Sequence, residues 1–308
     1  MISNLQKTLK EPIEFEGVGL HNGIKANLCI KPAEANSGIK FKRTDIDNSK
    51  NIIEANYLNV NSPVLCTKIQ NADGVSVSTI EHLMAAFYLE SIDNALIEID
   101  APEVPILDGS SFDFVEAIRS FGTLEQKSPK KFIKVIKKVE IKEGSKSISI
   151  QPLNKDLIID FEIVYKNPLI RTRRKEFRLS NGDLVPIYNS KTFCLYEDID
   201  QIKSQGLAQG GSLENAIVVK ENKILNEDGL RYRDEFVNHK ILDCLGDLML
   251  SGHRIFGHII TSQGGHQLTN TLLKKLFSDK SNWEFESFEK KQKDQKDSSY
   301  TSPVAVNA

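Results

Sequence analysis

The sequence predicts an α+β protein built of two similar halves, and the order of its segments is the basis for this prediction. Each half begins with segments that alternate apolar and polar residues or are rich in β-forming residues, which is typical of strands. Each half then has an apolar helix with histidine in or near its first turns, followed by a strand: EHLMAAF before DNALIEI, and NHKILDC before RIFGHII. Identity between the halves is too low to prove a duplication, but the shared order indicates two similar α+β domains.

Composition and charge restrict the class of protein. The chain has 308 residues, of which 40% are hydrophobic and 27% charged, as is typical of a globular protein with room for two domains. Its net charge of −2 disfavours a general nucleic-acid-binding protein. The start, MISNLQKTLKEPIEF, lacks the apolar core of a signal peptide, and no apolar run could span a bilayer. We therefore expect a cytoplasmic protein with no transmembrane segment; peripheral contact with a membrane surface is compatible with this sequence.

Strands dominate the first half, and a polar segment ends it. Residues 1–75 alternate or carry β-formers, with Gly and Asn at the turns. The GVGLHNG stretch is a glycine-rich loop in which we expect His21 to be an exposed turn residue. Residues 125–131, EQKSPKK, are polar, basic and interrupted by proline, which predicts the domain boundary. The expected domains are residues 1–127 and 131–285.

A helix expected over residues 79–91 carries the first candidate site residues. Ser78 and Glu81 have the spacing of a capping box, which gives Glu81 a structural role. The following residues, LMAAFYL, are apolar on all sides and predict a buried helix, so His82 needs a polar partner. A helix N-terminus favours the neutral imidazole that binds metals. A core histidine bonded to a backbone carbonyl is the alternative.

A second helix, expected over residues 234–250, carries further polar candidates. His239 and Asp243 are four residues apart, so their side chains reach the same point beside the helix and suit two ligands of one metal ion. Asp247 lies roughly 12 Å further along the axis than His239, too far to bind the same ion but well placed to orient another group. An amphipathic helix with a solvated polar face is the simpler interpretation of this segment alone.

The two helices together suggest a catalytic metal site. Two histidines and one carboxylate would make a three-ligand zinc site whose fourth position is left for water. A glutamate beside a ligand could act as base for that water. Spacing does not establish that His82 and His239 meet. The four cysteines are scattered, with no C-x-x-C pair, which disfavours a thiolate zinc site.

Other segments receive simpler interpretations. Asp108 and Ser110 are expected only to cap the helix that starts near them. The stretch KNPLIRTRRKEFRLSNGD is basic and rich in turn residues, which suits a phosphate-attracting patch or a solvated loop. From about Phe285 the chain is polar and highly charged, and we expect residues 286–308 to be a disordered tail.

An ordered set of motifs resembles one known family. STIEHL, GVGLHNG, APEVPILDGS, KTFC, GGSLENAIVV, LNEDGLRYRDEFVNHKILDCLGDL and SQGGHQLTN together look like the bacterial UDP-3-O-acyl-N-acetylglucosamine deacetylases of lipid A biosynthesis, from near the N-terminus to about residue 285. The resemblance implies two domains of like topology, each a mainly antiparallel sheet with two helices, and the helices packed between the two sheets. It also implies a monomeric cytoplasmic hydrolase, near the inner membrane surface, whose substrate is a UDP-sugar carrying a fatty acyl chain.

The resemblance assigns roles to individual residues. His82, His239 and Asp243 would hold Zn²⁺, with Fe²⁺ as an alternative ion. Glu81 would be the general base, and the zinc ion, Thr192 and Lys240 would stabilise the oxyanion that forms at the 2-acetamido carbonyl. His266, expected at the end of strand 255–262, would protonate the leaving amine, and Asp247 would accept its hydrogen bond and keep it protonated.

The same resemblance implies where the substrate binds. The segment of about residues 193–219 would form an apolar passage for the 3-O-acyl chain; its candidate lining is Leu195, Ile199, Ile202, Leu207, Ala208, Ala216 and Val218. The implied substrate-binding residues are Leu65, Cys66, Phe193, Asp198, Gly211, Ala216 and Lys240. Gln263 departs from the lysine common in the family, which puts nucleotide contacts there in doubt. Two alternatives remain: a zinc amidohydrolase of another acylated sugar, and a non-catalytic binding protein of the same fold.

Overall fold

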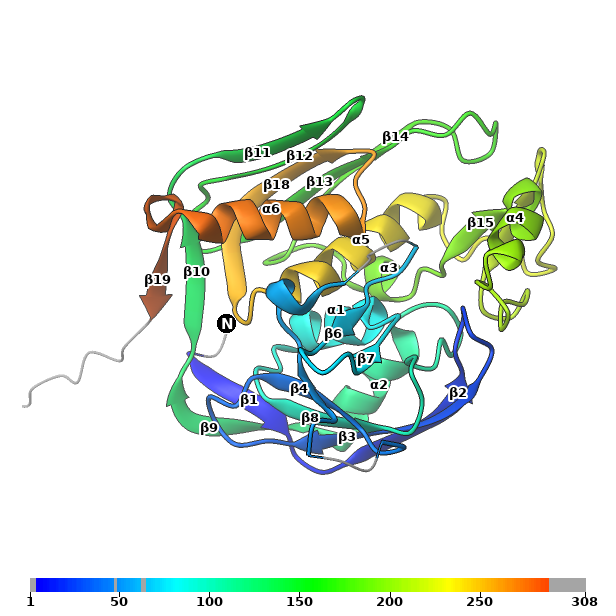
Figure 1. The fold of residues 1–308 in the computed structure, drawn as a ribbon. Coiled ribbons are helices and arrows are strands. Elements are labelled where there is room, and N and C mark those ends of the chain that lie inside the picture. Colours follow the sequence, from blue (N-terminus) through cyan, green and yellow to red (C-terminus); the bar gives the residue numbers. More distant parts are fainter. Residues whose placement is uncertain (1–3, 47–48, 62–64, 288–308) are drawn as a thin grey trace, which may run out of the picture.

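The computed structural model describes residues 4–46, 49–61 and 65–287 and contains two α+β halves (Figure 1). Each half places helices on one face of a mainly antiparallel sheet. The helices of both halves meet in the middle of the molecule, with the sheets outside (Figure 1). The α+β class predicted from the sequence is therefore confirmed.

The first half is organised around the five-stranded sheet β2-β3-β8-β4-β5, whose described strand pairs are antiparallel except β4 with β8. Alternate residues of β4 and β8 are buried, so one face is covered by helices and the other faces solvent. Two antiparallel pairs, β1–β9 and β6–β7, complete this half. The elements are β1 (Leu5–Leu9), β2 (Ile13–Val18), β3 (Lys25–Pro32), β4 (Ile39–Arg43), β5 (Ile52–Glu54), β6 (Ile69–Gln70), β7 (Ser76–Val77), α1 (Glu81–Glu90), β8 (Ala95–Ile99), α2 (Phe112–Phe121) and β9 (Thr123–Pro129).

The second half is built around β18 (Arg254–Ser262), which pairs with three strands. Helix α5 (Glu235–Met249) packs against β13 and β14, and α6 (His266–Ser278) packs against β11 and β12. A small sheet, β15-β16-β17, projects at one side with α4 (Figure 1). The other elements are β10 (Lys131–Val135), β11 (Val139–Glu143), β12 (Lys146–Gln151), β13 (Leu157–Ile163), β14 (Arg173–Arg178), α3 (Val185–Tyr188), β15 (Phe193–Leu195), α4 (Ile199–Ser204), β16 (Ile217–Lys220), β17 (Lys223–Ile224) and β19 (Trp283–Ser287).

A glycine lets the two halves approach closely. Helix α1 lies along α5, and a Cβ atom added at Gly246 would lie only 2.0 Å from the carbonyl oxygen of Glu81. Glycine inside a helix costs about 1 kcal/mol relative to alanine, so its presence here reflects the need for this contact. The close approach brings the first turn of α1 against the face of α5 that carries His239 and Asp243.

The polar segment expected at the domain boundary forms parts of two strands. Residues 123–129 form strand β9, and the single residue Lys130 separates it from β10. The Lys130 side chain is 1% exposed, and its Nζ lies 2.9 Å from an Asp93 carboxylate oxygen. Within the described residues, the strands before Lys130 pair with one another and so do the strands after it.

Two other segments also differ from expectation. The basic stretch forms edge strand β14, and its arginines at 173, 174 and 178 form ion pairs with Asp234, Asp160 and Asp156. Three of the six basic side chains of this stretch are therefore paired with carboxylates. The tail expected over residues 286–308 was predicted to start too early, because residues up to Ser287 belong to β19, which pairs with β10. Residues 288–308 lie outside the described part of the chain.

Candidate active site

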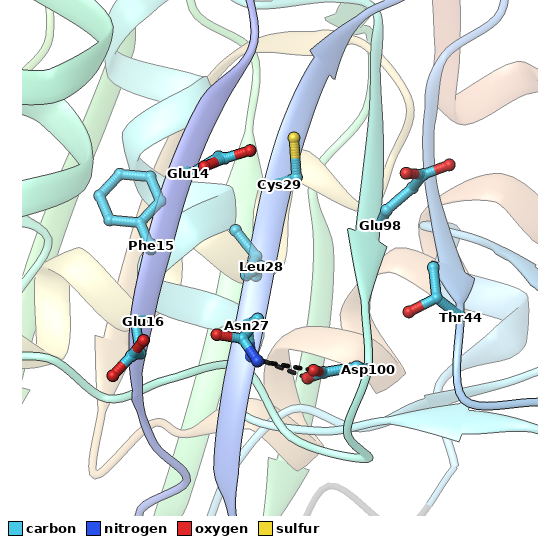
Figure 2. Close-up of a pocket in the computed structure, with 9 residues that line it drawn as sticks. All are labelled: Glu14, Phe15, Glu16, Asn27, Leu28, Cys29, Thr44, Glu98 and Asp100. Atoms are coloured by element: carbon cyan, nitrogen blue, oxygen red, sulfur yellow. Dashed lines mark hydrogen bonds between the residues drawn. The ribbon is translucent and has the colours of Figure 1, made fainter.

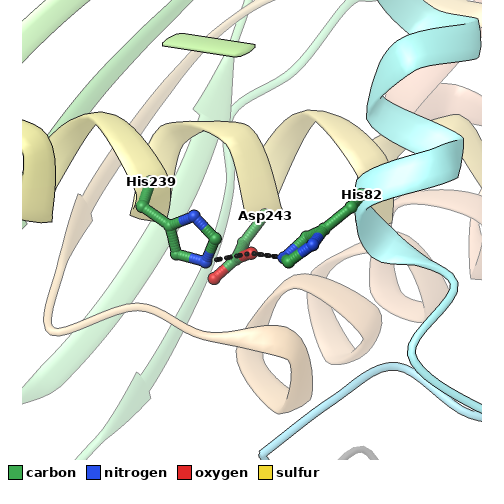
Figure 3. Close-up of side chains that lie close together, drawn as sticks. All are labelled: His82, His239 and Asp243. Atoms are coloured by element: carbon green, nitrogen blue, oxygen red, sulfur yellow. Dashed lines mark ion pairs between the residues drawn. The ribbon is translucent and has the colours of Figure 1, made fainter. Parts of the chain in front are cut away.

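Three side chains from the two halves form a buried group suited to a metal ion. His82 comes from the first turn of α1, and His239 and Asp243 come from one face of α5 (Figure 3). Their potential ligand atoms all lie within 4.8 Å of one another. Asp243 Oδ1 is 3.3 Å from His239 Nε2 and 3.7 Å from His82 Nε2. These separations are close to the spacing of about 3.4 Å between neighbouring ligands of a tetrahedral ion bound at about 2.1 Å.

His239 is held in the form that binds a metal. Its Nδ1–H donates to the carbonyl oxygen of Ser190, 3.0 Å away, which leaves the Nε2 lone pair facing Asp243. Burial lowers the pKa of His239 to about 3, although Asp243 opposes this shift, so the imidazole is neutral near pH 7. A hydrogen bond of this kind to the second ring nitrogen is the usual support of a ligating histidine.

Asp243 supplies the negative charge of the group. Its Oδ2 accepts a hydrogen bond from Lys240 Nζ at 2.5 Å, whereas its buried Oδ1 has no hydrogen-bond donor among the described residues. Burial favours the neutral acid, but His239 and Lys240 outweigh it and hold the pKa of Asp243 well below its ordinary value. A buried, ionised oxygen without a donor, facing two imidazole nitrogens, fits a divalent cation such as Zn²⁺ or Fe²⁺.

Glu81 lies beside this group and does not form the expected capping box. Helix α1 has Ile80 as its N-cap with no side-chain cap, and the Ser78 hydroxyl donates instead to the carbonyl oxygen of Pro102. The Glu81 carboxylate turns inward: Oε2 accepts from the Thr67 backbone N–H at 3.0 Å, and Oε1 is 3.7 Å from His266 Nε2. Burial raises the pKa of Glu81, against the effect of His266 and His82.

His266 lies on the other side of Glu81. It is the first residue of α6 rather than the end of strand β18, because residues 263–265 separate the two elements. Its Nδ1 is 2.9 Å from Asp247 Oδ2, the partner expected from the sequence. Burial alone would lower the pKa of His266, but the carboxylates of Asp247 and Glu81 outweigh it and raise the pKa to about 9.

A cavity of about 440 Å³ opens onto these groups. Thr192, Lys240 and Gln263 also line it, so the structure brings the two expected oxyanion donors to the same space as the metal group. Lys146 lies in the lining near Gln263.

An adjoining apolar cavity of about 400 Å³ lies under the projecting segment of residues 193–225. The two cavities share Leu20, Leu65, Thr192 and Phe193, so they are continuous along these side chains. The apolar cavity is also lined by the expected residues Ile199, Ile202, Ala208, Gly211, Ala216 and Val218.

Some expected lining residues are absent from both cavities. Leu195, Leu207, Asp198 and Cys66 do not line them. Cys66 is buried, and burial raises the pKa of its thiol to about 12. His21 was expected to be an exposed turn residue, which is wrong. It is buried and lines the apolar cavity, because its loop pairs with residues 209–210.

A separate groove of about 430 Å³ lies on the outer face of the first sheet (Figure 2). Its carboxylates include Glu98, which forms ion pairs with Lys31 and Lys42, and Asp100, which accepts two hydrogen bonds from Asn27. Glu98 is thus paired with two lysines and Asp100 with a neutral asparagine, as is common on a solvated sheet surface.

Sequence reasoning missed two residues of the site. Ser190 contributes a backbone carbonyl, which no residue-type pattern can indicate. Thr67 contacts Glu81, Asp247 and His266, yet it lies in a short segment, LCTKI, with no helical spacing to relate it to them.

Fold and site together define a class: an α+β protein of two like halves whose interface holds a candidate catalytic metal group with an adjacent carboxylate and a charged imidazole. Comparison with known proteins assigns the family. The sequence model of the UDP-3-O-acyl N-acetylglycosamine deacetylases matches residues 6–278. The chain belongs to this family, as its motifs suggested.

Curated relatives agree with this assignment over almost the whole chain. Proteins from Shewanella violacea and Haemophilus ducreyi, both named UDP-3-O-acyl-N-acetylglucosamine deacetylase, are each 43% identical to it. The alignments cover 92% of this chain, and 93% and 94% of the two relatives. A protein of the same name from Actinobacillus succinogenes is 43% identical over 94% of this chain and 95% of its own length. In the described part of the chain, no helix is long and apolar enough to cross a membrane.

Proposed function

We propose that this enzyme hydrolyses the 2-acetamido group of a UDP-3-O-acyl-N-acetylglucosamine, releasing acetate and the free amine, in lipid A biosynthesis. Family membership supports the substrate class. The observation that carries the chemistry is the buried group of His82, His239 and Asp243, with Glu81 and His266 at its side. We further propose that the enzyme acts as a monomer in the cytoplasm.

His82, His239 and Asp243 are the proposed ligands of one Zn²⁺ ion, with Fe²⁺ as the alternative. When bound, such an ion lowers the pKa of water and polarises a carbonyl oxygen. The protein supplies the rest: it holds the His239 imidazole neutral and the Asp243 carboxylate ionised, and it buries the side chains of all three proposed ligands.

Glu81 and His266 are the proposed base and acid. Glu81 Oε1 faces the cavity side of the site and takes a proton from the attacking water. His266 carries a proton on Nε2, which faces Glu81 and the cavity, and gives it to the leaving amine. Asp247 holds the imidazolium through Nδ1. The carboxylates favour the charged imidazole, and the charged imidazole favours the ionised base against the burial that raises the pKa of Glu81.

Thr192 and Lys240 are the proposed donors to the developing oxyanion. Both line the cavity, and the Lys240 ammonium keeps further N–H donors beyond the one that Asp243 accepts. Burial lowers the pKa of Lys240, but Asp243 outweighs it and raises the pKa above its ordinary value, so the ammonium stays charged.

The substrate is proposed to lie across both cavities. Its acyl chain suits the apolar cavity beside Leu65, Phe193, Gly211 and Ala216. At the other end, Lys146 supplies a positive charge where Gln263 supplies none, which favours diphosphate binding there. Asp198 and Cys66 line neither cavity, so we propose no direct substrate contact for them.

An acetate-release assay tests the proposal. The wild-type protein, with its metal content measured, is given the acylated acetamido sugar with and without uridine diphosphate. Release only with the nucleotide supports the proposed substrate; equal release from both indicates an amidohydrolase of another acylated sugar. Absence of release by metal-loaded protein would leave the non-catalytic alternative.

A further inference from the structure

Thr67 occupies a position between the two groups that are proposed to move protons. Its backbone N–H donates to Glu81 Oε2 at 3.0 Å. Its hydroxyl donates to Asp247 Oδ1 at 2.5 Å and lies 3.0 Å from His266 Nδ1. One residue therefore contacts the base, the acid and the carboxylate that supports the acid.

The hydrogen-bond directions around its hydroxyl follow from what each group can donate. An ionised carboxylate only accepts, so the single hydroxyl hydrogen of Thr67 points to Asp247. The hydroxyl oxygen can then only accept from His266, and Asp247 Oδ2 also faces that ring nitrogen, at 2.9 Å. Nδ1 must therefore carry a hydrogen. The ring is fixed with Nδ1 toward Thr67 and Asp247, and with Nε2 toward Glu81.

The backbone of Thr67 fixes the other partner. Its N–H satisfies Glu81 Oε2, so the second oxygen, Oε1, is the one left facing His266 Nε2 at 3.7 Å. The carbonyl oxygen of Thr67 accepts from the N–H of Ile80, the residue before α1, at 3.4 Å. The segment that carries Thr67 is thus tied to the start of the helix that carries Glu81.

Thr67 has no access to the substrate. The residue is 2% exposed and lines neither the metal-site cavity nor the apolar cavity. Any effect of its hydroxyl on turnover must therefore act through Asp247 and His266.

We propose that Thr67 is a positioning residue that fixes the orientation of the Glu81 and His266 side chains relative to each other. Its N–H binds Glu81, and its hydroxyl binds Asp247 and His266. This inference rests on the proposed function, because it gives these two side chains their roles as base and acid. It adds a fourth member to the group of Glu81, His266 and Asp247.

The test separates the hydroxyl from the bulk of the side chain. Thr67→Val keeps the shape and removes the hydroxyl, and Thr67→Ser keeps the hydroxyl. We expect the valine variant to lose roughly 10- to 100-fold in kcat, the usual effect of losing a hydrogen bond to a charged group, with KM within about twofold of wild type. Its metal content should be unchanged, since Thr67 contacts none of the three proposed ligands. The serine variant should restore kcat to within about threefold of wild type.

Thr8→Val is the matched control. Thr8 is equally buried, and its hydroxyl also has a donor and an acceptor, the N–H of Ala33 and the carbonyl oxygen of Asn94, on the first sheet's side of the molecule. It should lower the melting temperature without changing kcat. Equal kcat in Thr67→Val and wild type, or equal loss of kcat in Thr67→Val and Thr67→Ser, would overturn the proposal.

A crystal structure of Thr67→Val gives a readout that does not depend on turnover. We expect the Glu81 or His266 side chain to rotate from its wild-type position, and unchanged positions of both would also overturn the proposal. Should the valine variant not fold, Thr67→Ala tests the same hydroxyl with less crowding. Inactivity of wild-type protein on the acetamido sugar would refute the proposed function instead, and the crystal structure would still decide whether Thr67 positions the pair.

Discussion

Replacing Asp247 by asparagine should move the basic limb of the pH–rate profile to lower pH. His266 must be protonated to act as acid, so the rate falls as pH rises through its pKa. That pKa is raised to about 9 because Asp247 and Glu81 outweigh the opposing effect of burial. Relative to free imidazole at about 6.5, this is about 3 kcal/mol in favour of the charged ring.

The size of the effect follows from these values. With a pKa of about 9, roughly three quarters of the protein carries the imidazolium at about pH 8.5. If loss of the Asp247 charge returns the pKa to about 6.5, the fraction falls to about one hundredth, and the rate falls roughly 80-fold. At about pH 6 the same change in pKa lowers the rate by less than about 1.5-fold. If the variant also loses the orientation of the His266 ring, its rate falls by a further factor that does not depend on pH.

Acetate release at saturating substrate, followed from about pH 5.5 to about pH 10, measures the two limbs. Asp156→Asn is the matched control, because Asp156 is a buried carboxylate bonded to Arg178 and Ser180, outside the site. Its profile should match that of wild type, and the metal content should be unchanged in both variants. A folded, metal-loaded Asp247→Asn protein with a wild-type basic limb would refute the assignment of His266 as the acid.

Three further predictions concern the other parts of the site. His239→Ala and Asp243→Ala should each lose most of the bound metal; full occupancy in both, measured by elemental analysis, would remove the proposed ligand set. Glu81→Gln should retain the metal but lose about 10²- to 10⁴-fold in kcat, because the amide cannot take a proton, and near-normal turnover would contradict its role as base. Ala216→Trp fills the apolar cavity and should raise KM for long-acyl substrates much more than for short-acyl ones; equal effects would show that this wall does not contact the acyl chain.

Local spacing predicted what lies on one helix, but not what meets across the molecule. The interval between His239 and Asp243 placed both side chains at one point, because a helix repeats every 3.6 residues. The meeting with His82 depends on the packing of α1 against α5, about which neither helix carries information, and only the family resemblance indicated it. The buried N-terminus of α1 also explains the failed capping box: Glu81 bonds to Thr67 from another segment instead of to its own helix.

Loops were the other source of error. The exposed position expected for His21 follows from its glycine-rich surroundings, but the projecting segment of the second half covers that loop. His266 was expected at the end of strand 255–262, but it is the first residue of α6, after the short connection of residues 263–265.

The contact at Gly246 has a consequence for how the sequence can change over evolution. Where two helices touch through side chains, each substitution in the core shifts their separation by a fraction of an ångström. Here the backbone of α1 rests on the backbone of α5, so the separation is set by atoms that every sequence shares. Most of the surrounding core can therefore vary while His82 keeps its place opposite Asp243. Gly246 itself cannot vary in this way, because a single added methyl group there would push the two halves apart.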